Sequence, residues 1–187
     1  MSDQIPELVK GFVSGDEADF AELIRIFRRK IYSVAYKFLG NHLDADEVVQ
    51  ETFVRIYRKR KELGDVKYFS TFLVRVASNY SIDLLRKRKG HSGLDNDTNS
   101  LSGIDQLDLS KRVPTPSEEY ENKRLMTEIK LALDQLPPRQ KLTAILHDVE
   151  GFTKSEVADI LECPKATVRS NLHIARSKLK RILKDRL

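Results

Sequence analysis

The stretch 153–183 constrains this chain most, because it predicts two helices with a sharp break between them. Thr153 and Glu156 have the spacing of a capping box, in which the two residues satisfy each other's free backbone N–H groups. Pro164 follows the first helix, and a proline both ends a helical hydrogen-bond ladder and suits the first turn of the next helix. A short helix, a tight turn and a longer helix are the outline of a helix-turn-helix.

The second of these helices carries two stripes on different faces. The apolar stripe has helical spacing, predicts the side that packs inward, and consists of Val168, Leu172, Ala175, Leu179 and Ile182. The basic stripe consists of Lys165, Arg169, His173, Arg176 and Lys180. From Lys165 to the C-terminus eight Lys or Arg residues stand against one acid, and such charge on a helix usually contacts phosphates. This pattern favours a helix that reads the major groove of DNA. An ordinary helical hairpin with a solvated basic face stays open as the alternative.

Composition limits the class of protein. The 187 residues suffice for one large domain or two small ones, and the net charge of +5 favours an acidic partner such as nucleic acid. The one cysteine, Cys163, allows no internal disulfide and fits a reducing compartment. No apolar run approaches the roughly 20 residues of a membrane span, and the N-terminus lacks the pattern of a signal peptide. We therefore expect a soluble, cytoplasmic protein.

Helical periodicity predicts an all-α fold of two small helical domains joined by a flexible linker. Amphipathic helices with short connections fill 1–90 and predict an N-terminal helical bundle. The stretch 91–117 is rich in Ser, Asp, Asn, Gly and Pro and shows no helical stripe, which is typical of a linker. Fully extended, this linker would reach about 90 Å. Helical patterns resume in 118–187, the predicted helix-turn-helix domain.

Local patterns also predict where individual helices begin. Asp16 is expected to cap a long helix that ends at Gly40. Asp44 with Glu47 has the pattern of another capping box, and Ser70 is expected to cap the helix after that.

Three stretches carry patterns that can be compared with known families. They are DADEVVQETFVR at 44–55, FSTFLVRVASN at 69–79, and 136–173, which begins with LPPR and ends with TVRSNLH. Together they resemble the extracytoplasmic-function sigma factors of bacterial RNA polymerase. The first is similar to the acidic helix of that family that binds core polymerase, the second to the helix that opens and reads the −10 promoter element, and the third to the module that reads the −35 element.

The resemblance implies three sets of contact residues. Core polymerase would bind Asp46, Glu47, Gln50, Glu51, Phe53 and Arg55. The −10 element would meet Tyr68, Phe69, Ser70 and Asn79, with Arg86, Lys87, Arg88 and Lys89 beside phosphates. The −35 element would meet Lys165, Thr167, Arg169, Ser170, His173 and Arg176. The implied partners are core RNA polymerase, promoter DNA and an anti-sigma factor.

No catalytic role is expected. The sequence has no glycine-rich phosphate loop and no nucleophile–base pair, and the spacing of its Cys and His residues matches no zinc signature. We therefore expect no cofactor, no metal and no enzymatic activity.

Some positions depart from the family pattern, and two other classes of protein stay open. Phe72 stands where the family usually has Trp, and Asn171 and Ile174 stand where basic residues are common. Phe72 and Tyr80 also have core spacing, which favours packing roles for both. A stand-alone helix-turn-helix regulator would explain the C-terminal domain but leave the acidic helix and Asn79 without a role. A protein-interaction bundle with incidental charge is the third possibility.

Overall fold

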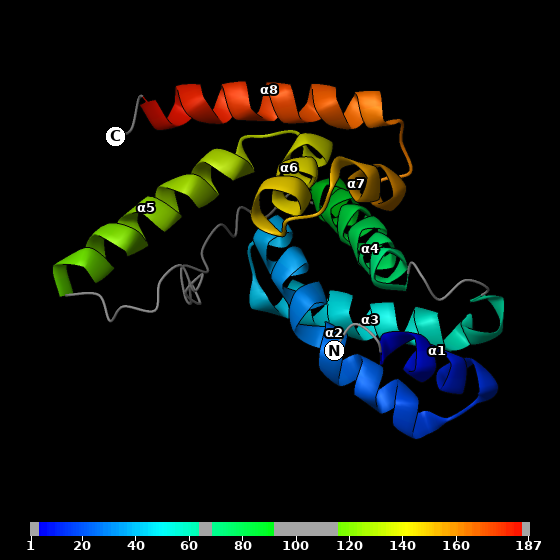
Figure 1. Ribbon diagram of the computed structural model, residues 1–187. Coiled ribbons are helices and arrows are strands. Elements are labelled where there is room, and N and C mark those ends of the chain that lie inside the picture. The colour runs from blue at the N-terminus through cyan, green and yellow to red at the C-terminus, as the bar shows by residue number, and fades with distance from the viewer. Residues whose placement is uncertain (1–3, 64–68, 92–115, 185–187) are drawn as a thin grey trace.

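The computed structural model describes residues 4–63, 69–91 and 116–184, and for residues 89–91 and 116–123 it describes the course of the backbone only. Every regular element in these ranges is helical, and the helices form two domains, which confirms the predicted fold class (Figure 1). The predicted linker, 91–117, lies almost wholly outside the described residues.

Side-chain caps and glycines set the helix boundaries of the N-terminal domain. Its elements are α1 (Ile5–Ser14), α2 (Glu17–Leu39), α3 (His42–Arg58), the short 3-10 helix η1 (Arg60–Glu62) and α4 (Phe69–His91). Asp16 caps α2 by accepting hydrogen bonds from the backbone N–H groups of Ala18 at 2.8 Å and Asp19 at 3.2 Å. Gly40 follows α2 with a φ of 83°, a left-handed conformation that glycine adopts without a Cβ penalty. Both ends of α2 therefore agree with the prediction.

The start of α3 differs from the predicted one. Asn41 caps this helix, because its side-chain oxygen accepts a hydrogen bond from the backbone N–H of Asp44 at 2.8 Å. Asparagine is as good an N-cap as aspartate, and Asn41 comes first along the chain. The predicted capping box of Asp44 and Glu47 is therefore wrong, and Asp44 instead lies buried in the first turn. The helix after it begins at Phe69, so Ser70 lies inside the first turn of α4.

The C-terminal domain contains the predicted helix-turn-helix. Its elements are α5 (Pro116–Asp134), α6 (Pro138–Ala144), the π-helical turn η3 (Ile145–Val149), α7 (Lys154–Ile160) and α8 (Lys165–Lys184). The capping box is confirmed: Thr153 Oγ1 accepts from the Glu156 N–H at 3.2 Å, and Glu156 Oε2 accepts from the Thr153 N–H at 2.8 Å. The turn between α7 and α8 places Glu162 at a φ of 49°, the left-handed region.

Replacing Thr153 by alanine is expected to destabilise the protein by about 1 kcal/mol, because the first turn of α7 loses its cap. For a chain of this length such a loss lowers the melting temperature by about 2–4 °C. Thermal unfolding followed by circular dichroism measures it. Thr153→Ser keeps the hydroxyl and should melt like the wild type, and equal melting temperatures for both variants would contradict the prediction.

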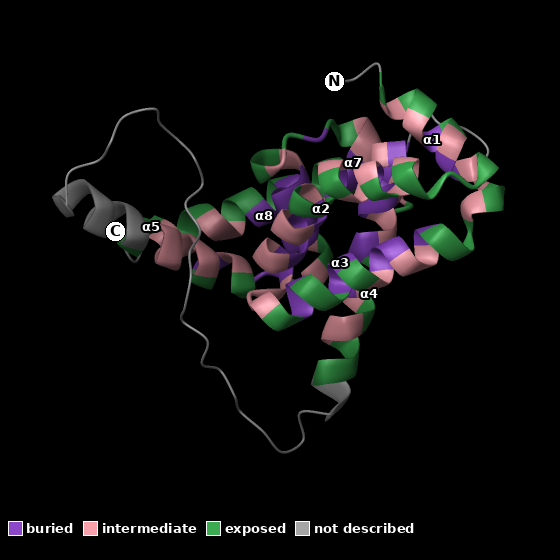
Figure 2. Ribbon diagram, turned by 90° about the horizontal axis from the view of Figure 1, so that it is seen from below, coloured by how far each residue is buried: buried purple, intermediate pink, exposed green. Residues whose placement is uncertain are grey.

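Two apolar clusters hold the helices together. The first lies within the N-terminal domain and includes Phe12, Leu23, Phe27, Ile31, Val48 and Ile56. The second joins the two domains, because Val34 and Phe38 of α2 and Val74 of α4 pack against the C-terminal side chains Leu142, Ile145, Leu146, Phe152, Val157 and Leu161. Figure 2 shows the buried positions on the inward faces of these helices. The domains thus share a continuous apolar interface.

Polar contacts reinforce this interface. Glu150, which follows η3, accepts hydrogen bonds from Lys37 Nζ at 2.6 Å and from Ser33 Oγ at 2.9 Å on α2. Arg75 of α4 and Glu162 of the helix-turn-helix form an ion pair at 3.5 Å. The helix-turn-helix is therefore held directly against α4 in this structure.

Candidate functional site

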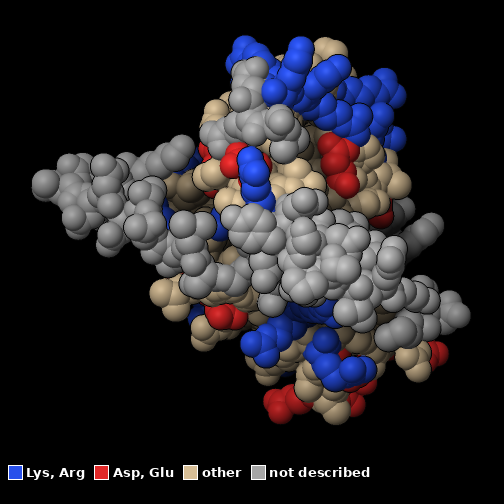
Figure 3. Space-filling view, turned by 90° about the vertical axis from the view of Figure 1, so that its left-hand side faces the viewer, with Lys and Arg blue, Asp and Glu red and all other residues tan. Residues whose placement is uncertain are grey.

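The basic stripe of α8 is exposed along its whole length. All five of its members, Lys165, Arg169, His173, Arg176 and Lys180, are exposed. The apolar stripe faces inward, with Val168, Leu172 and Ala175 buried. Figure 3 shows a dense group of Lys and Arg side chains at the top of the molecule, where α8 lies. A helix fixed by its apolar side and basic on its outer side can lie along a phosphate backbone.

A shallow cavity of about 280 Å³ lies on this stripe. The cationic side chains that line it are Lys154 of α7 and Arg169, Arg176 and Lys180 of α8, with His173 among them. No acid belongs to its lining. A cavity lined by cations and no acid suits an anionic group, such as a phosphate of the DNA backbone. The sequence did not reveal Lys154, because its approach to α8 depends on how the two helices cross.

Arg176 is oriented by an acid from another element. Its Nε donates to Asp148 Oδ2 at 3.2 Å and its Nη2 donates to Asp148 Oδ1 at 2.5 Å. A two-point contact of this kind fixes the plane of the guanidinium. The hydrogen bonds to Asp148 also raise the pKa of Arg176 above its ordinary value. Asp148 lies on η3, and no local sequence pattern links two residues this far apart in the chain.

The predicted −10 residues do not all reach the surface of α4. The exposed members are Asn79, Arg86, Lys87 and Arg88, and Ser70 is half-buried. Phe69 is buried, and its ring meets Phe27 edge to face with the centroids 5.7 Å apart. The structure thus places Phe69 in the core and away from solvent. Tyr68 and the side chain of Lys89 lie outside the described residues. Phe72 is half-buried against the core, which agrees with its predicted packing role.

The predicted polymerase-binding residues of α3 differ in how accessible they are. Asp46, Glu47 and Gln50 are exposed. Glu51 and Arg55 are half-buried and form an ion pair at 2.7 Å. Phe53 is only 7% exposed, although together with Asp46 and Gln50 it lines an open groove between α2 and α3. The acids and the amide are therefore available to a partner, whereas Phe53 mainly packs.

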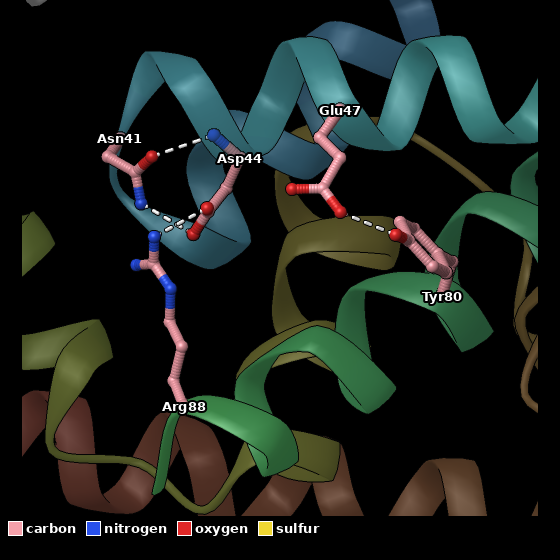
Figure 4. A network of polar contacts seen from close by, with 5 residues as sticks. All are labelled: Asn41, Asp44, Glu47, Tyr80 and Arg88. Atoms are coloured by element: carbon pink, nitrogen blue, oxygen red, sulfur yellow. Dashed lines mark hydrogen bonds and ion pairs between the residues drawn. The ribbon is translucent and has the colours of Figure 1, made fainter. Parts of the chain in front are cut away.

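A polar network connects α3 with α4 (Figure 4). The Tyr80 hydroxyl donates to Glu47 Oε1 at 2.5 Å, and Arg88 Nη2 contacts Asp44 Oδ1 at 2.5 Å. The hydrogen bond to Glu47 is the largest cause that raises the pKa of Tyr80 to about 12, followed by burial. Tyr80 was predicted to pack, and it does lie half-buried against the core. Its contact with Glu47 was missed, because the two residues stand on different helices.

The described residues contain neither a candidate membrane span nor a candidate metal centre. No helix in that part of the chain is long and apolar enough to span a bilayer. Within the same residues, no three His, Cys, Asp or Glu side chains come together as a metal site requires.

Comparison with known proteins places both domains in one family. The model described as Sigma-70 region 2 matches residues 23–91, and the model described as Sigma-70, region 4 matches residues 126–179. The chain is 29% identical to the ECF RNA polymerase sigma factor SigW of Bacillus subtilis, over 99% of this chain and 100% of SigW.

Two solved structures share the fold. CnrH, in complex with the cytosolic domain of CnrY, has a TM-score of 0.70 and 21% identity, covering 98% of this chain and 99% of CnrH. The sigma factor RpoE of Bartonella quintana, in complex with the anti-sigma factor NepR, has a TM-score of 0.68 and 20% identity, covering 89% of this chain and 97% of RpoE. Since region 2 and region 4 occupy the two helical domains in that order and one relative aligns over its full length, the chain belongs to the extracytoplasmic-function sigma factors, which direct RNA polymerase to promoters.

Proposed function

We propose that three exposed faces of this sigma factor divide the work of promoter recognition. The outer side of α3, with Asp46, Glu47 and Gln50 and the neighbouring pair Glu51 and Arg55, binds core polymerase. The exposed side of α4, with Asn79, meets the displaced strand of the −10 element. The exposed side of α8 reads the −35 element. Arg169, Ser170 and His173 face the bases, Lys165 and Arg176 lie beside phosphates, and Thr167 belongs to the same contact surface.

One observation carries the proposal: each face consists of exposed side chains on a helix whose opposite side is packed. On α8 the basic stripe is exposed while Val168, Leu172 and Ala175 are buried. On α3 Asp46, Glu47 and Gln50 are exposed while Ala45, Val48 and Val49 are buried. Binding residues on rigid helices are held in place before the partner arrives, which reduces the entropy lost on binding.

The contacts of α4 with DNA combine single-strand and phosphate binding. An exposed Asn79 can hydrogen-bond an unstacked base, as proteins that bind melted DNA do. Arg86 and Lys87 are exposed two turns further along the helix and are suited to phosphates. Phe69 packs in the core beneath this surface. For Tyr68 and Lys89, contact with the −10 element is proposed from the family resemblance alone.

In this role the chain performs no catalytic step and works in the cytoplasm, where polymerase and promoter DNA meet. It includes an anti-sigma factor as a partner, because the similar RpoE was solved in complex with the anti-sigma factor NepR. An inhibitor that covers the α3 face would compete directly with polymerase.

Reversing two charges on α3 tests the proposed polymerase face. The double variant Glu47→Lys, Glu51→Lys is expected to bind core polymerase about tenfold more weakly, because like charges replace opposite ones across the interface. Co-elution with bacterial core polymerase, followed by titration of labelled protein, measures the change. Glu62→Lys with Asp159→Lys is the matched control, since both acids are exposed and the charge change is identical.

The outcome separates the proposed function from its rivals. Stoichiometric binding that only the α3 variant loses supports a sigma factor that docks through this face. If the wild-type chain binds duplex DNA tightly but not core polymerase, it is a stand-alone regulator and the proposal is wrong. Equal losses in both variants would refute the α3 assignment alone.

A further inference from the structure

Tyr80 belongs to the helix of the proposed −10 face and contacts the proposed polymerase face, and the proposed function gives it no role. It stands on α4 directly after Asn79. Its hydroxyl donates to Glu47 Oε1 at 2.5 Å, and the guanidinium of Arg55 lies over its ring, 4.7 Å from the centroid. Arg55 in turn donates its Nε to Glu51 at 2.7 Å. One side chain of the −10 helix therefore contacts two residues of the polymerase face and, through Arg55, a third.

A second contact joins the same two helices. Arg88 Nη2 meets Asp44 Oδ1 at 2.5 Å. Residues 44 and 47 are three apart and residues 80 and 88 eight apart, spacings that return a helix to nearly the same face. The two contacts thus lie along one seam between α3 and α4, as Figure 4 shows.

The two contacts differ in what a partner can reach. The side chain of Asp44 is 5% exposed, and its other oxygen accepts a hydrogen bond from the Asn41 amide at 2.7 Å. Glu47 is exposed, and its second oxygen points away from Tyr80 in Figure 4. A carboxylate has acceptor sites on both oxygens. Polymerase can therefore bind Glu47 while the Tyr80 hydroxyl stays bonded to it.

We propose that Tyr80 is a positioning residue that holds Glu47 and Arg55 in the conformation that core polymerase binds. This inference rests on the proposed polymerase face and adds to it a residue from the −10 helix. Long charged side chains lose conformational freedom when a partner fixes them, and side chains already fixed by a neighbour lose less. The hydroxyl fixes the carboxylate of Glu47, and the ring supports the guanidinium of Arg55.

The position of Tyr80 also connects polymerase binding with −10 recognition. Tyr80 follows Asn79 in the chain and contacts Glu47 and Arg55. If α4 moves when it binds melted DNA, Tyr80 would therefore move these two side chains as well. Coupling between two binding events is reciprocal, because each changes the free energy of the other by the same amount. The seam is a direct route for such coupling within one domain.

A double-mutant cycle with Glu47→Gln tests the inference, with labelled full-length protein titrated against core polymerase. Tyr80→Phe removes the hydroxyl and keeps the ring, and it is expected to weaken binding about threefold to tenfold in the wild-type background. In the Glu47→Gln background the same change should add nothing, because the charged acceptor that the hydroxyl fixes is gone. This dependence on Glu47 is a readout that a general packing role would not produce.

Asp44→Asn is the matched control for loosening the seam. It weakens the buried contact with Arg88 and should lower the melting temperature, while the effect of Tyr80→Phe on polymerase binding persists in its background. Unchanged or tighter binding by Tyr80→Phe, or an equal loss in the Glu47→Gln background, would overturn the positioning role. If the wild-type chain does not bind core polymerase at all, the proposed function and this inference fall together, an outcome distinct from binding that ignores Tyr80.

Discussion

Replacing Arg169 and His173 together by alanine is expected to reduce transcription from a −35-dependent promoter by about a hundredfold. Each good side-chain contact to a base edge contributes about 1–3 kcal/mol of discrimination, and each 1.4 kcal/mol is a factor of ten. Both side chains are exposed near the N-terminal end of α8, the part of a recognition helix that contacts base edges. Run-off transcription with reconstituted polymerase measures the loss.

The fold should survive this double change, because neither side chain is buried. Arg181→Ala with Lys184→Ala is the matched control on the same helix, since both positions are exposed and lie in its last turn. The control loses only general attraction to phosphates and should change transcription by about threefold or less at moderate salt. If the Arg169 and His173 variant transcribes as well as the control, the −35 assignment of α8 is wrong.

How much could be predicted from the sequence depended on whether a signal was local. The capping box at Thr153, the break at Pro164 and the two stripes of α8 are patterns within a few residues, and the structure confirms each of them. The boundaries of α2 followed from Asp16 and Gly40 in the same way. The exception was the start of α3, where Asn41 and Asp44 are competing caps of similar strength and the order along the chain decided between them.

Contacts between helices could not be predicted in this way. Asp148 orients Arg176, and Tyr80 orients Glu47, only because distant helices cross at those points. The burial of Phe69 was equally hidden, since this residue has the chemistry of a contact residue but faces the core. The two departures on α8 differ in the structure: Ile174 is 39% exposed, whereas Asn171 is half-buried. Of these two, Ile174 is the more open to DNA.

The packing of the two domains against each other has a geometric consequence for promoter recognition. Asn79 lies one helical turn from Arg75, and Arg169 lies within a few residues of Glu162, the partner of Arg75. Since helical residues rise 1.5 Å each and extended residues span at most about 3.6 Å, this path keeps the two proposed reading sites within roughly 40 Å of each other. The names of the promoter elements place them about 25 base pairs apart, which is about 85 Å of duplex. Both elements can therefore be read together only after the domains separate, a distance that the predicted linker can span.

A cross-link that keeps the domains together is expected to reduce promoter-dependent transcription to background. The variant carries Arg75→Cys, Glu162→Cys and Cys163→Ser, so that its two thiols stand where the ion pair was. The side chains of that pair are 32% and 61% exposed, so a reagent can reach both positions. A short reducible bismaleimide should join them. The linked protein should still bind core polymerase, because the exposed acids of α3 lie outside this contact.

Three states of the same variant make this test specific. The unlinked protein and the protein released by reduction should both transcribe, and only the linked form should fail, so the substitutions themselves cannot explain the loss. A promoter that depends on the −10 element alone should lose less activity, since the linked protein still presents Asn79 at an exposed position. Full activity of the linked protein at a promoter that needs both elements would show that the closed arrangement of α4 and the helix-turn-helix does not limit recognition.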